Sequence, residues 1–470
     1  MPSSVCSCQL CQKGSRAISL GCIWILRKTS RVAIFCLVIA AGVQAQPAAP
    51  AAAPPDTQGM PSVVHLSIKG SGRLLPLAVL DFSREGTEPE LEQRAKMVST
   101  FLGDDLRNGG RFEVLRDSLQ VDSTGWAPVF ERGSAAGARA LLRGSMRQKE
   151  GRTELFATLY RLPDQRVLIA KGYPVDQGQA LEAAHRLSND IVYALTGQQG
   201  IAFTQIAFVS QRRGDKEIYV MGYDGYAPRP VTNDRSINYS PDWSPDGRQV
   251  VYSSMRDGRW ELFIADLVAG VKTPIRTSST SNAAPTWSPD GRRVLFAMHT
   301  EGNTDLCMVT VPGWQLQRIT DHPEVDTEPA WSPDGRQIAF TSDRAGSPQV
   351  YLMNADGSDV RRLTWEPDAY EGAPAWSPDG KRIAFLRRGF DLFDIYVVEV
   401  EGGTPVRMTS GGSSENPCWS PDGLQLAFSS NRTGNYEIYA MGWDGGNLRR
   451  LTYGGENILP DWSPLSVGNR

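Results

Sequence analysis

Histidine and cysteine are scarce in this sequence, and their scarcity limits the chemistry that the chain can perform. Among 470 residues there are 4 histidines and 7 cysteines. No G-x-S-x-G nucleophile motif occurs in the chain. The histidines have no spacing typical of metal ligands, and we interpret each as structural or solvent-exposed: His65, His185, His299 and His322. We therefore expect no catalytic residue, no metal site and no cofactor.

The sequence also lacks a strong charge of either sign. Its formal net charge is −3 and its pI is near 6.0. Nucleic-acid-binding domains usually carry a strong excess of lysine and arginine. We therefore expect no nucleic-acid partner.

Most of the cysteines precede an expected cleavage site. A basic stretch, Arg27 to Arg31, leads into the apolar run "VAIFCLVIAAGV" at 32–43, which is too short for an ordinary membrane span. Val43-Gln44-Ala45 has the small-x-small pattern of a signal peptide cleavage site. We predict a signal peptide over residues 1–45, with an over-extended start and no lipid anchor. Cys307 and Cys418 then remain, and we expect no disulfide between them.

A motif of about 44 residues is repeated through the second half of the chain. Six Trp-Ser-Pro cores begin, at spacings of 44, 44, 45, 43 and 43 residues, at Trp243, Trp287, Trp331, Trp376, Trp419 and Trp462. The third copy contains four short apolar runs, "PAWS", "QIAFTS", "QVYLMN" and "VRRLTW", which we name strands a to d. A Pro-Asp-Gly turn separates strands a and b, and each tryptophan is expected to pack between neighbouring blades. The period and strand count predict a six-bladed β-propeller.

The last copy is incomplete in a way that predicts how the ring closes. After Trp462 the sequence has no Asp-Gly turn and no strand b. The runs "QIAFVS", "EIYVMG" and "PRPVTN", at 205–233, supply strands b, c and d without a preceding Trp-Ser-Pro. We expect the C-terminal strand to pair with these three, because this pairing leaves no open sheet edge.

The region before the propeller has a different pattern. Residues 46–59 form a Pro/Ala-rich spacer, and residues 60–200 are predicted to form a small α/β (α+β) domain ahead of a propeller at 201–470. Apolar spacing predicts helices at 91–106 and 180–195. The expected strands are "SVVHLSI", "LPLAVLDF", "ALLRGSM", "TELFATLY" and "RVLIAKG".

Two sets of charged residues recur in the propeller repeats. Carboxylates precede strand a, and we interpret them as a solvated acidic rim at one mouth of the central channel, with a cation or a basic partner as the alternative: Asp326, Glu328, Asp368, Glu371 and Glu415. Arginines follow strand b in several blades, and we interpret them as structural pairing residues: Arg212, Arg256, Arg344 and Arg432.

Several of these features together resemble the TolB family, the periplasmic component of the Tol–Pal system of Gram-negative cell envelopes. They are the signal peptide, "LRNGGRF" at 106–112, "YDGY" at 223–226, and six blades ending on "DWSP". The resemblance implies a non-enzymatic adaptor that supports outer-membrane integrity and constriction during division. It implies binding of the lipoprotein Pal by the propeller and of the C-terminal domain of TolA by the N-terminal segment. Other outer-membrane proteins are further possible partners, and contact with the membrane is indirect, through them.

The resemblance also nominates contact residues. Family contacts to Pal match loops just before strand a, in "SNAAPTW" and "DTEPAW"; they are Asn282, Ala284, Pro285, Thr327, Glu328 and Pro329. The contact with TolA corresponds to the segment from Val63 to Ser71, with Val63, Val64, His65, Leu66, Ser67 and Ile68 as its residues.

Two functions of other classes remain as alternatives. One is a propeller that serves as accessory subunit of a peptidase, against which stands the absent nucleophile motif. The other is a polysaccharide-binding or lyase propeller, against which stands the lack of clustered histidines.

Overall fold

The structure is a computed structural model that describes residues 74–86, 88–115, 127–149, 151–162, 164–175, 178–279, 281–300 and 302–465. The expected signal peptide, the Pro/Ala-rich spacer and the segment from Val63 to Ser71 lie outside these residues. Among the described helices, none combines the length and the hydropathy that a membrane-spanning helix needs.

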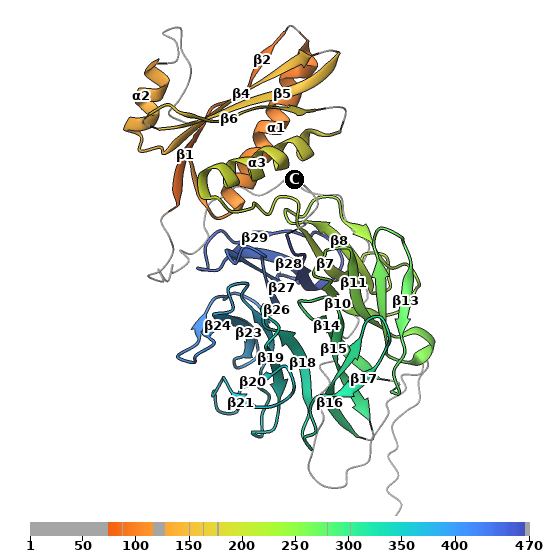
Figure 1. The fold of residues 1–470 in the computed structure, drawn as a ribbon. Coiled ribbons are helices and arrows are strands. Elements are labelled where there is room, and N and C mark those ends of the chain that lie inside the picture. Colours follow the sequence, from red (N-terminus) through yellow and green to blue (C-terminus); the bar gives the residue numbers. More distant parts are fainter. Residues whose placement is uncertain are drawn as a thin grey trace, which may run out of the picture. The chain divides into compact units, whose positions relative to one another are not determined.

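The first part of the fold is a mixed sheet with three helices (Figure 1). Its strands run in the order β3-β1-β4-β5-β6, with β2 beside β4. β1 is parallel to β3 and β4, whereas β4, β5 and β6 are antiparallel. The bounds are β1 Leu75–Val79, β2 Ser83–Glu85, β3 Phe112–Leu115, β4 Ala140–Lys149, β5 Arg152–Arg161, β6 Val167–Pro174, α1 Pro89–Asn108, α2 Ala127–Ala135 and α3 Ala180–Thr196.

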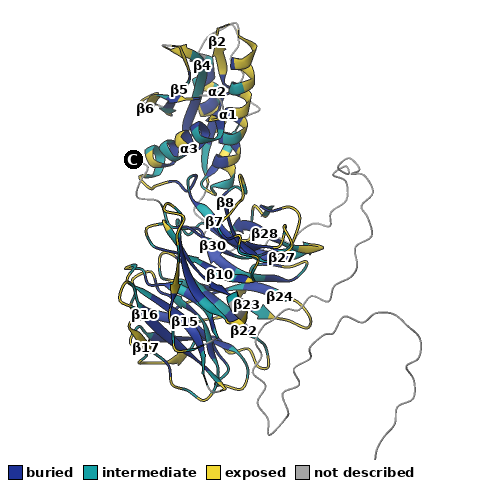
Figure 2. Ribbon diagram, turned by 90° about the vertical axis from the view of Figure 1, so that its right-hand side faces the viewer, coloured by how far each residue is buried: buried dark blue, intermediate teal, exposed yellow. Residues whose placement is uncertain are grey.

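Both predicted helices of this α/β domain are present, and the sequence analysis missed α2 and the short strands β2 and β3. α1 begins with Pro89, and the N–H that proline lacks would have no partner in the first turn of a helix. The negative charge of Glu90 in the same turn interacts favourably with the positive end of the helix dipole. α1 and α3 bury their apolar faces on one side of the sheet, around residues such as Leu102 and Leu187. α2 contributes Val129 to a smaller apolar cluster that also contains Leu141 of β4. Figure 2 marks the buried stretches of these helices and strands in dark blue.

The second part is a propeller of six four-stranded antiparallel sheets, as predicted. Strand a of each sheet is β10 Asn238–Trp243, β14 Asn282–Trp287, β18 Asp326–Trp331, β22 Glu371–Trp376, β26 Ser414–Trp419 or β30 Asn457–Trp462. Strand b is β11 Gln249–Ser254, β15 Arg293–Thr300, β19 Gln337–Ser342, β23 Arg382–Arg388, β27 Gln425–Thr433 or β7 Gln205–Ser210. Strand c is β12 Glu261–Asp266, β16 Asn303–Thr310, β20 Gln349–Asn354, β24 Phe393–Glu399, β28 Asn435–Gly442 or β8 Glu217–Gly222. The short strand d is β13 Lys272–Ile275, β17 Leu316–Arg318, β21 Arg361–Arg362, β25 Val406–Arg407, β29 Arg449–Arg450 or β9 Arg229–Pro230.

The predicted closure of the ring is confirmed. The sixth sheet has the order β30-β7-β8-β9, so the C-terminal strand β30 supplies strand a to strands from the start of the propeller. Asn457 lies opposite Ser210 and Trp462 opposite Ile206 in this pairing. The Trp462 indole N–H also donates to Thr204 Oγ1 at 2.9 Å.

The repeated motif acts locally in the way that its residues predict. In the third copy the Ser332 hydroxyl donates to Asp334 Oδ1 at 2.7 Å, and the N–H of Arg336 donates to the same oxygen at 3.1 Å. Gly335 has a φ of 70°, a conformation that glycine adopts at least cost. Trp287 is 6% exposed and packs between Leu262 of the preceding blade and Phe296 of its own. The motif therefore makes both the turn and the contact between blades.

Candidate functional site

The six inner strands surround a central channel with a cavity of about 450 Å³. Each strand a contributes the same positions to the wall, together with the proline of the turn that follows in five of the six blades. Among the described residues that line the channel there is no lysine and no arginine. The channel is therefore a wide, partly polar cavity, and the charged side chains among its described lining residues are all carboxylates.

A β-bulge shapes every one of these inner strands. In each blade the pairing of strands a and b shifts register in the middle of strand a. The third residue has a φ near +50°, which is unfavourable for residues other than glycine; these residues are Ser240, Ala284, Glu328, Ala373, Asn416 and Leu459. All six line the channel. Strained backbone of this kind is concentrated at binding and catalytic sites, so we regard the ring of bulges as the candidate site.

Proline explains why the bulge occurs where it does. The residue after each left-handed position is a proline, as in Pro285 and Pro329. Proline cannot donate to a ladder and is confined to sheet edges and bulges. Strand a is the inner edge strand of each sheet, so both conditions are met. This proline was visible in the sequence, and it is the signal that could have predicted the bulge.

Buried carboxyls form a further layer of the channel wall. Asp461 accepts a hydrogen bond from the N–H of Trp243 at 2.7 Å, and Asp242 accepts one from the N–H of Trp287 at 2.7 Å. Burial raises the pKa of Asp461 to about 7. Burial and the neighbouring Asp461 raise the pKa of Asp242. The negative charge of the channel therefore increases as pH rises through neutrality.

The predicted solvated acidic rim is wrong for most of its members. Asp326 is fully buried and pairs with Arg344 at 2.8 Å, and Glu371 is fully buried in an ion pair with Arg387. These carboxylates begin strand a and have to be paired because they are removed from water. Glu415 is half-buried and accepts a hydrogen bond from the Tyr436 hydroxyl. Of the five carboxylates proposed, only Asp368 is exposed.

Glu328 is also held by protein groups. Its Oε2 accepts hydrogen bonds from the Thr341 hydroxyl and from the N–H of Ala373 in the next blade, both at 2.8 Å. Burial raises the pKa of this carboxyl. Glu328 therefore links two blades as well as lining the channel.

The arginines after strand b have the structural role that was predicted. Each stacks over an aromatic ring of its own blade: Arg212 over Tyr219, Arg256 over Phe263, Arg344 over Tyr351 and Arg432 over Tyr439. Arg256 also pairs with Asp234 at 2.7 Å. Three of the four also donate to the first residue of a strand a: Arg212 to Asn457, Arg344 to Asp326 and Arg432 to Ser414.

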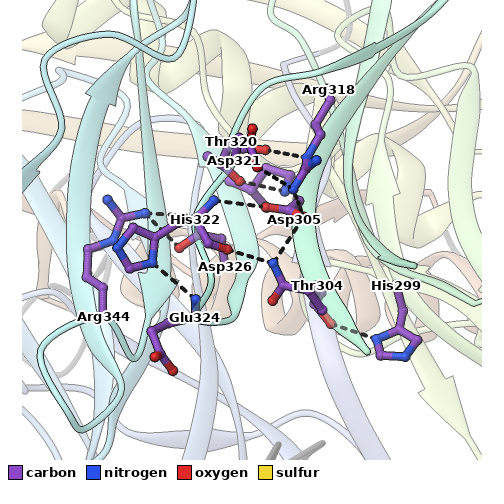
Figure 3. Close-up of polar contacts among 12 residues, drawn as sticks. His299, Thr304, Asp305, Arg318, Thr320, Asp321, His322, Glu324, Asp326 and Arg344 are labelled. Atoms are coloured by element: carbon purple, nitrogen blue, oxygen red, sulfur yellow. Dashed lines mark hydrogen bonds and ion pairs between the residues drawn. The ribbon is translucent and has the colours of Figure 1, made fainter. Parts of the chain in front are cut away.

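The loop that enters β18 is held by a polar network (Figure 3). Asp305 of β16 pairs with Arg318 of β17 at 2.6 Å, and Arg318 Nε donates to the carbonyl of Thr320 at 2.9 Å. His322 lies in this loop, where its Nδ1 accepts the N–H of Glu324 at 3.2 Å. His299 Nδ1 lies 3.1 Å from Thr304 Oγ1, so both histidines have hydrogen-bond partners within the protein, in keeping with the structural role expected of them.

The six residues nominated for binding Pal lie within strands β14 and β18, and their expected position in loops before strand a is wrong. Ala284, Pro285, Glu328 and Pro329 line the channel. Thr327 is half-buried beside them. Asn282 is buried, and its Nδ2 donates to the carbonyl of Trp260 at 3.1 Å and to Thr277 Oγ1 at 3.0 Å. Four of the six are thus placed to meet a ligand in the channel, and Asn282 instead fixes the start of its strand.

The remaining predictions concern the TolA-binding segment, the two cysteines and His185, and only the last two fall on described residues. The residues nominated for binding TolA, including His65, lie outside the described residues. Cys307 and Cys418 are both free and buried, as expected. His185 is buried in α3 with two carboxylates beside it, an arrangement that its sequence spacing did not reveal.

The two ends of the channel differ in what surrounds them. The turns between strands a and b and between c and d lie at one end, and the α/β domain contacts them there: Arg111 pairs with Asp422 at 3.2 Å, and Phe101 packs edge-to-face on Tyr226. The loops between strands b and c and between d and a lie at the other end. We call these ends the docked end and the open end.

Large aromatic side chains are exposed at the open end. Trp365 and Tyr453 occupy equivalent loops between strands d and a and are 67% and 72% exposed. Phe390, between β23 and β24, is fully exposed. Exposed aromatic side chains are frequent in protein-binding surfaces. The open end is therefore the better candidate for contact with a partner.

Family profiles match both parts of the fold. A profile described as the TolB beta propeller domain matches residues 192–371 and 368–467, more than half of the chain. The chain belongs to the TolB family. A second profile, the TolB amino-terminal domain, matches residues 66–165.

Individual relatives agree with this assignment. The chain is 32% identical over 193 residues to the Tol-Pal system protein TolB of Methylobacillus flagellatus, an alignment that covers 39% of this chain and 42% of the relative. It is 40% identical over 159 residues to the protein of the same name from Geobacter sulfurreducens, covering 33% of this chain and 37% of that one. The alignments thus span about two fifths of these relatives. The crystal structure of TolB from Acinetobacter baumannii matches 84% of this chain and 98% of its own, with 26% identity and a TM-score of 0.72.

Proposed function

We propose that this protein is a non-enzymatic periplasmic adaptor of the Tol–Pal system whose propeller binds the lipoprotein Pal at the open end of the channel. Membership of the TolB family supports a role in this system, since relatives carry the name Tol-Pal system protein TolB. In this role the protein helps to maintain the outer membrane and its constriction during division.

The single observation that carries the proposal is the ring of left-handed residues around the channel. Six bulges turn six different side chains into a cavity of about 450 Å³, at the cost of backbone strain in every blade. Backbone strain of this kind is often retained where it serves binding. The open end, away from the α/β domain, gives a folded partner access to these residues and to Trp365 and Phe390 around them.

We propose further that the segment Val63 to Ile68 binds TolA. Its alternation of apolar and polar residues has the period of a strand with one apolar face, which suits addition to the sheet edge of a partner. The support for this contact is the sequence pattern and the family membership.

Ala284→Arg tests the Pal site directly. The equivalent positions hold larger residues, including Asn416 and Leu459, at nearly the same φ, so the fold tolerates a long side chain there. An arginine at 284 is expected to obstruct the channel and to weaken Pal binding at least tenfold, which corresponds to about 1.4 kcal/mol. Titration calorimetry against purified Pal measures the effect.

The matched control places the same arginine at the docked end. Val268 is 82% exposed between β12 and β13, and Val268→Arg should leave Pal affinity unchanged. Wild-type affinity in Ala284→Arg, with normal unfolding, would exclude the channel as the Pal site. Pull-down of a peptidase or of an oligosaccharide-containing fraction from envelope extract, without Pal, would favour one of the alternative functions.

A further inference from the structure

A buried polar cluster lies where the α/β domain meets the docked end of the propeller. The α/β domain contributes Asp105 from α1 and His185 from α3. The propeller contributes Tyr223 and Asp224 from the turn between β8 and β9. Asp105, His185 and Tyr223 are each less than a tenth exposed, and Asp224 is half-buried. The cluster therefore joins two parts of the fold through side chains that are removed from water.

The four groups form one continuous chain of contacts. The Tyr223 hydroxyl donates to Asp105 Oδ1 at 2.5 Å, and Asp105 Oδ2 lies 2.8 Å from His185 Nδ1. On the other side of the ring, His185 Nε2 lies 3.6 Å from Asp224 Oδ2. The imidazole thus has a carboxylate at each nitrogen, one from its own domain and one from the propeller. Only an imidazole with both nitrogens protonated can donate a hydrogen bond to Asp105 and also turn a charged N–H towards Asp224, with which it forms an ion pair.

The charges around the ring favour that doubly protonated form. Four titratable groups face the ring: Asp105 on α1, Glu182 on α3, and Tyr223 and Asp224 on the β8–β9 turn. The positive charge of Arg449 on β29 acts in turn on Tyr223 and Asp224. With His185 protonated, two cations balance the two aspartates. With His185 neutral, the buried cluster carries an unbalanced negative charge, which is costly in a medium of low dielectric constant.

The pKa shifts have the same direction. Burial lowers the pKa of His185, but the hydrogen bond with Asp105 and the charges of Asp105, Asp224 and Glu182 raise it more, so that it ends above its ordinary value of 6.5. Burial raises the pKa of Asp105. Both shifts mean that the folded cluster holds a proton more tightly than its separated groups do.

A bound metal ion fits this geometry less well. One ligand atom from each of Asp105, His185 and Asp224 lies within 4.8 Å of the other two, which is close enough for a shared ion. The two imidazole nitrogens, however, face different carboxylates, so an ion bound at one nitrogen would be directed towards only one of the aspartates. The charge of the Arg449 guanidinium acts on Asp224 and Tyr223, and it would repel a cation. A cluster held together by the protons of His185 needs no ion and no change in the positions of these side chains.

We propose that Asp105, His185, Tyr223 and Asp224 form a proton-dependent latch that holds the α/β domain against the propeller while His185 carries both ring protons. The sign follows from linkage. Because the pKa of His185 is raised by folding, its contribution is complete below about pH 6.5 and is lost as pH rises through the higher pKa of the folded protein. The latch is closed in mildly acidic solution and loosens in alkaline solution.

The test measures the separation of the two domains in the full chain across pH. Spin labels at two exposed positions, Tyr193→Cys on α3 and Val268→Cys on the propeller, report the distance distribution; the native Cys307 and Cys418 are buried. We expect one narrow distribution at pH 5.5 and a broader one at pH 9. The titration of the His185 ring nitrogens, followed by nuclear magnetic resonance, should have the same midpoint.

Two variants separate the latch from a merely structural contact. Asp224→Asn keeps the size of the side chain and removes one carboxylate, so the midpoint should fall by about one pH unit. His185→Gln cannot be protonated and should abolish the pH dependence. His299→Gln makes the same substitution at a half-buried histidine in the propeller, hydrogen-bonded to Thr304, and should keep the wild-type midpoint.

Three results would overturn the proposal. One is a distance distribution that does not change between pH 5.5 and pH 9. Another is an Asp224→Asn midpoint equal to that of the wild type, even if His185→Gln fails to fold. The third is closure that needs added Zn²⁺ and is reversed by a chelator, which would assign the cluster to a metal ion instead.

Discussion

The docked end and the open end of the propeller are built from the same repeat but differ in the side chains that they bury and expose. At the docked end, charged side chains are buried against the α/β domain in ion pairs, as Arg111 is with Asp422. At the open end, Trp365, Phe390 and Tyr453 are exposed, and the arginines Arg362 and Arg450 stack on two of them. Paired polar groups fix one geometry, whereas exposed aromatics keep their apolar area available for a partner.

The comparison also shows that identical repeats acquire different roles through what they contact. Five of the Trp-Ser-Pro cores continue into the same turn, in which the serine hydroxyl donates to the aspartate. Among the described turns, only some carry residues that reach the α/β domain, among them Asp422, Tyr223 and Asp224. In the β18–β21 blade the equivalent of Asp422 is Asp334, whose partners among the described residues are groups of its own turn and the solvent-exposed Arg336.

The largest loss of stability is expected from removing β30, the strand that closes the ring and so supports both ends of the propeller. Deleting residues 457–470 takes β30 from its sheet, exposes an edge of β7 and removes the buried Trp462. We expect a loss of about 5 kcal/mol or more, enough to abolish cooperative folding. Soluble yield and thermal unfolding measure it, with deletion of 466–470 alone as the control. An unchanged melting temperature in the longer deletion would contradict closure by β30.

An intermediate effect should come from the docked end. Asp422→Ala and Asp334→Ala remove equivalent turn aspartates, each of which accepts a serine hydroxyl and a backbone N–H. Only Asp422→Ala also leaves the largely buried Arg111 without its carboxylate, although Gln198 still accepts from it. We expect Asp422→Ala to cost about 3 kcal/mol more in the free energy of unfolding. Equal losses in urea unfolding would mean that the ion pair adds nothing.

The smallest change in stability is expected at the open end. Phe390 is fully exposed, so Phe390→Ser should alter the free energy of unfolding by less than about 0.5 kcal/mol. If the open end binds Pal, the same substitution should weaken binding by about threefold to tenfold, since apolar contact area is lost. Titration calorimetry against Pal measures the affinity of Phe390→Ser and of the control Val268→Arg, and urea unfolding of the same two variants measures their stability. Equal affinity in the two variants would place the Pal contact away from this loop.

The sequence by itself determined the propeller, because its information is local and repeated. Trp331, Pro333, Asp334 and Gly335 specify a turn and a blade contact within one repeat, and the missing half-repeat after Trp462 specified the closure. The two long helices of the α/β domain were likewise predicted from apolar spacing. The short strand β3 and the helix α2 were missed because their few residues have too weak a pattern to predict an element.

Only the tertiary structure decided which charged residues are available to a partner. Asp326 and Glu371 looked like surface carboxylates in the sequence, but Arg344 and Arg387 bury and pair them once strands a and b lie side by side. His185 looked isolated, since its partners Asp105 and Asp224 are 80 and 39 residues away in sequence. Pairing and burial depend on contacts between distant parts of the chain, and short-range patterns in a sequence do not contain them.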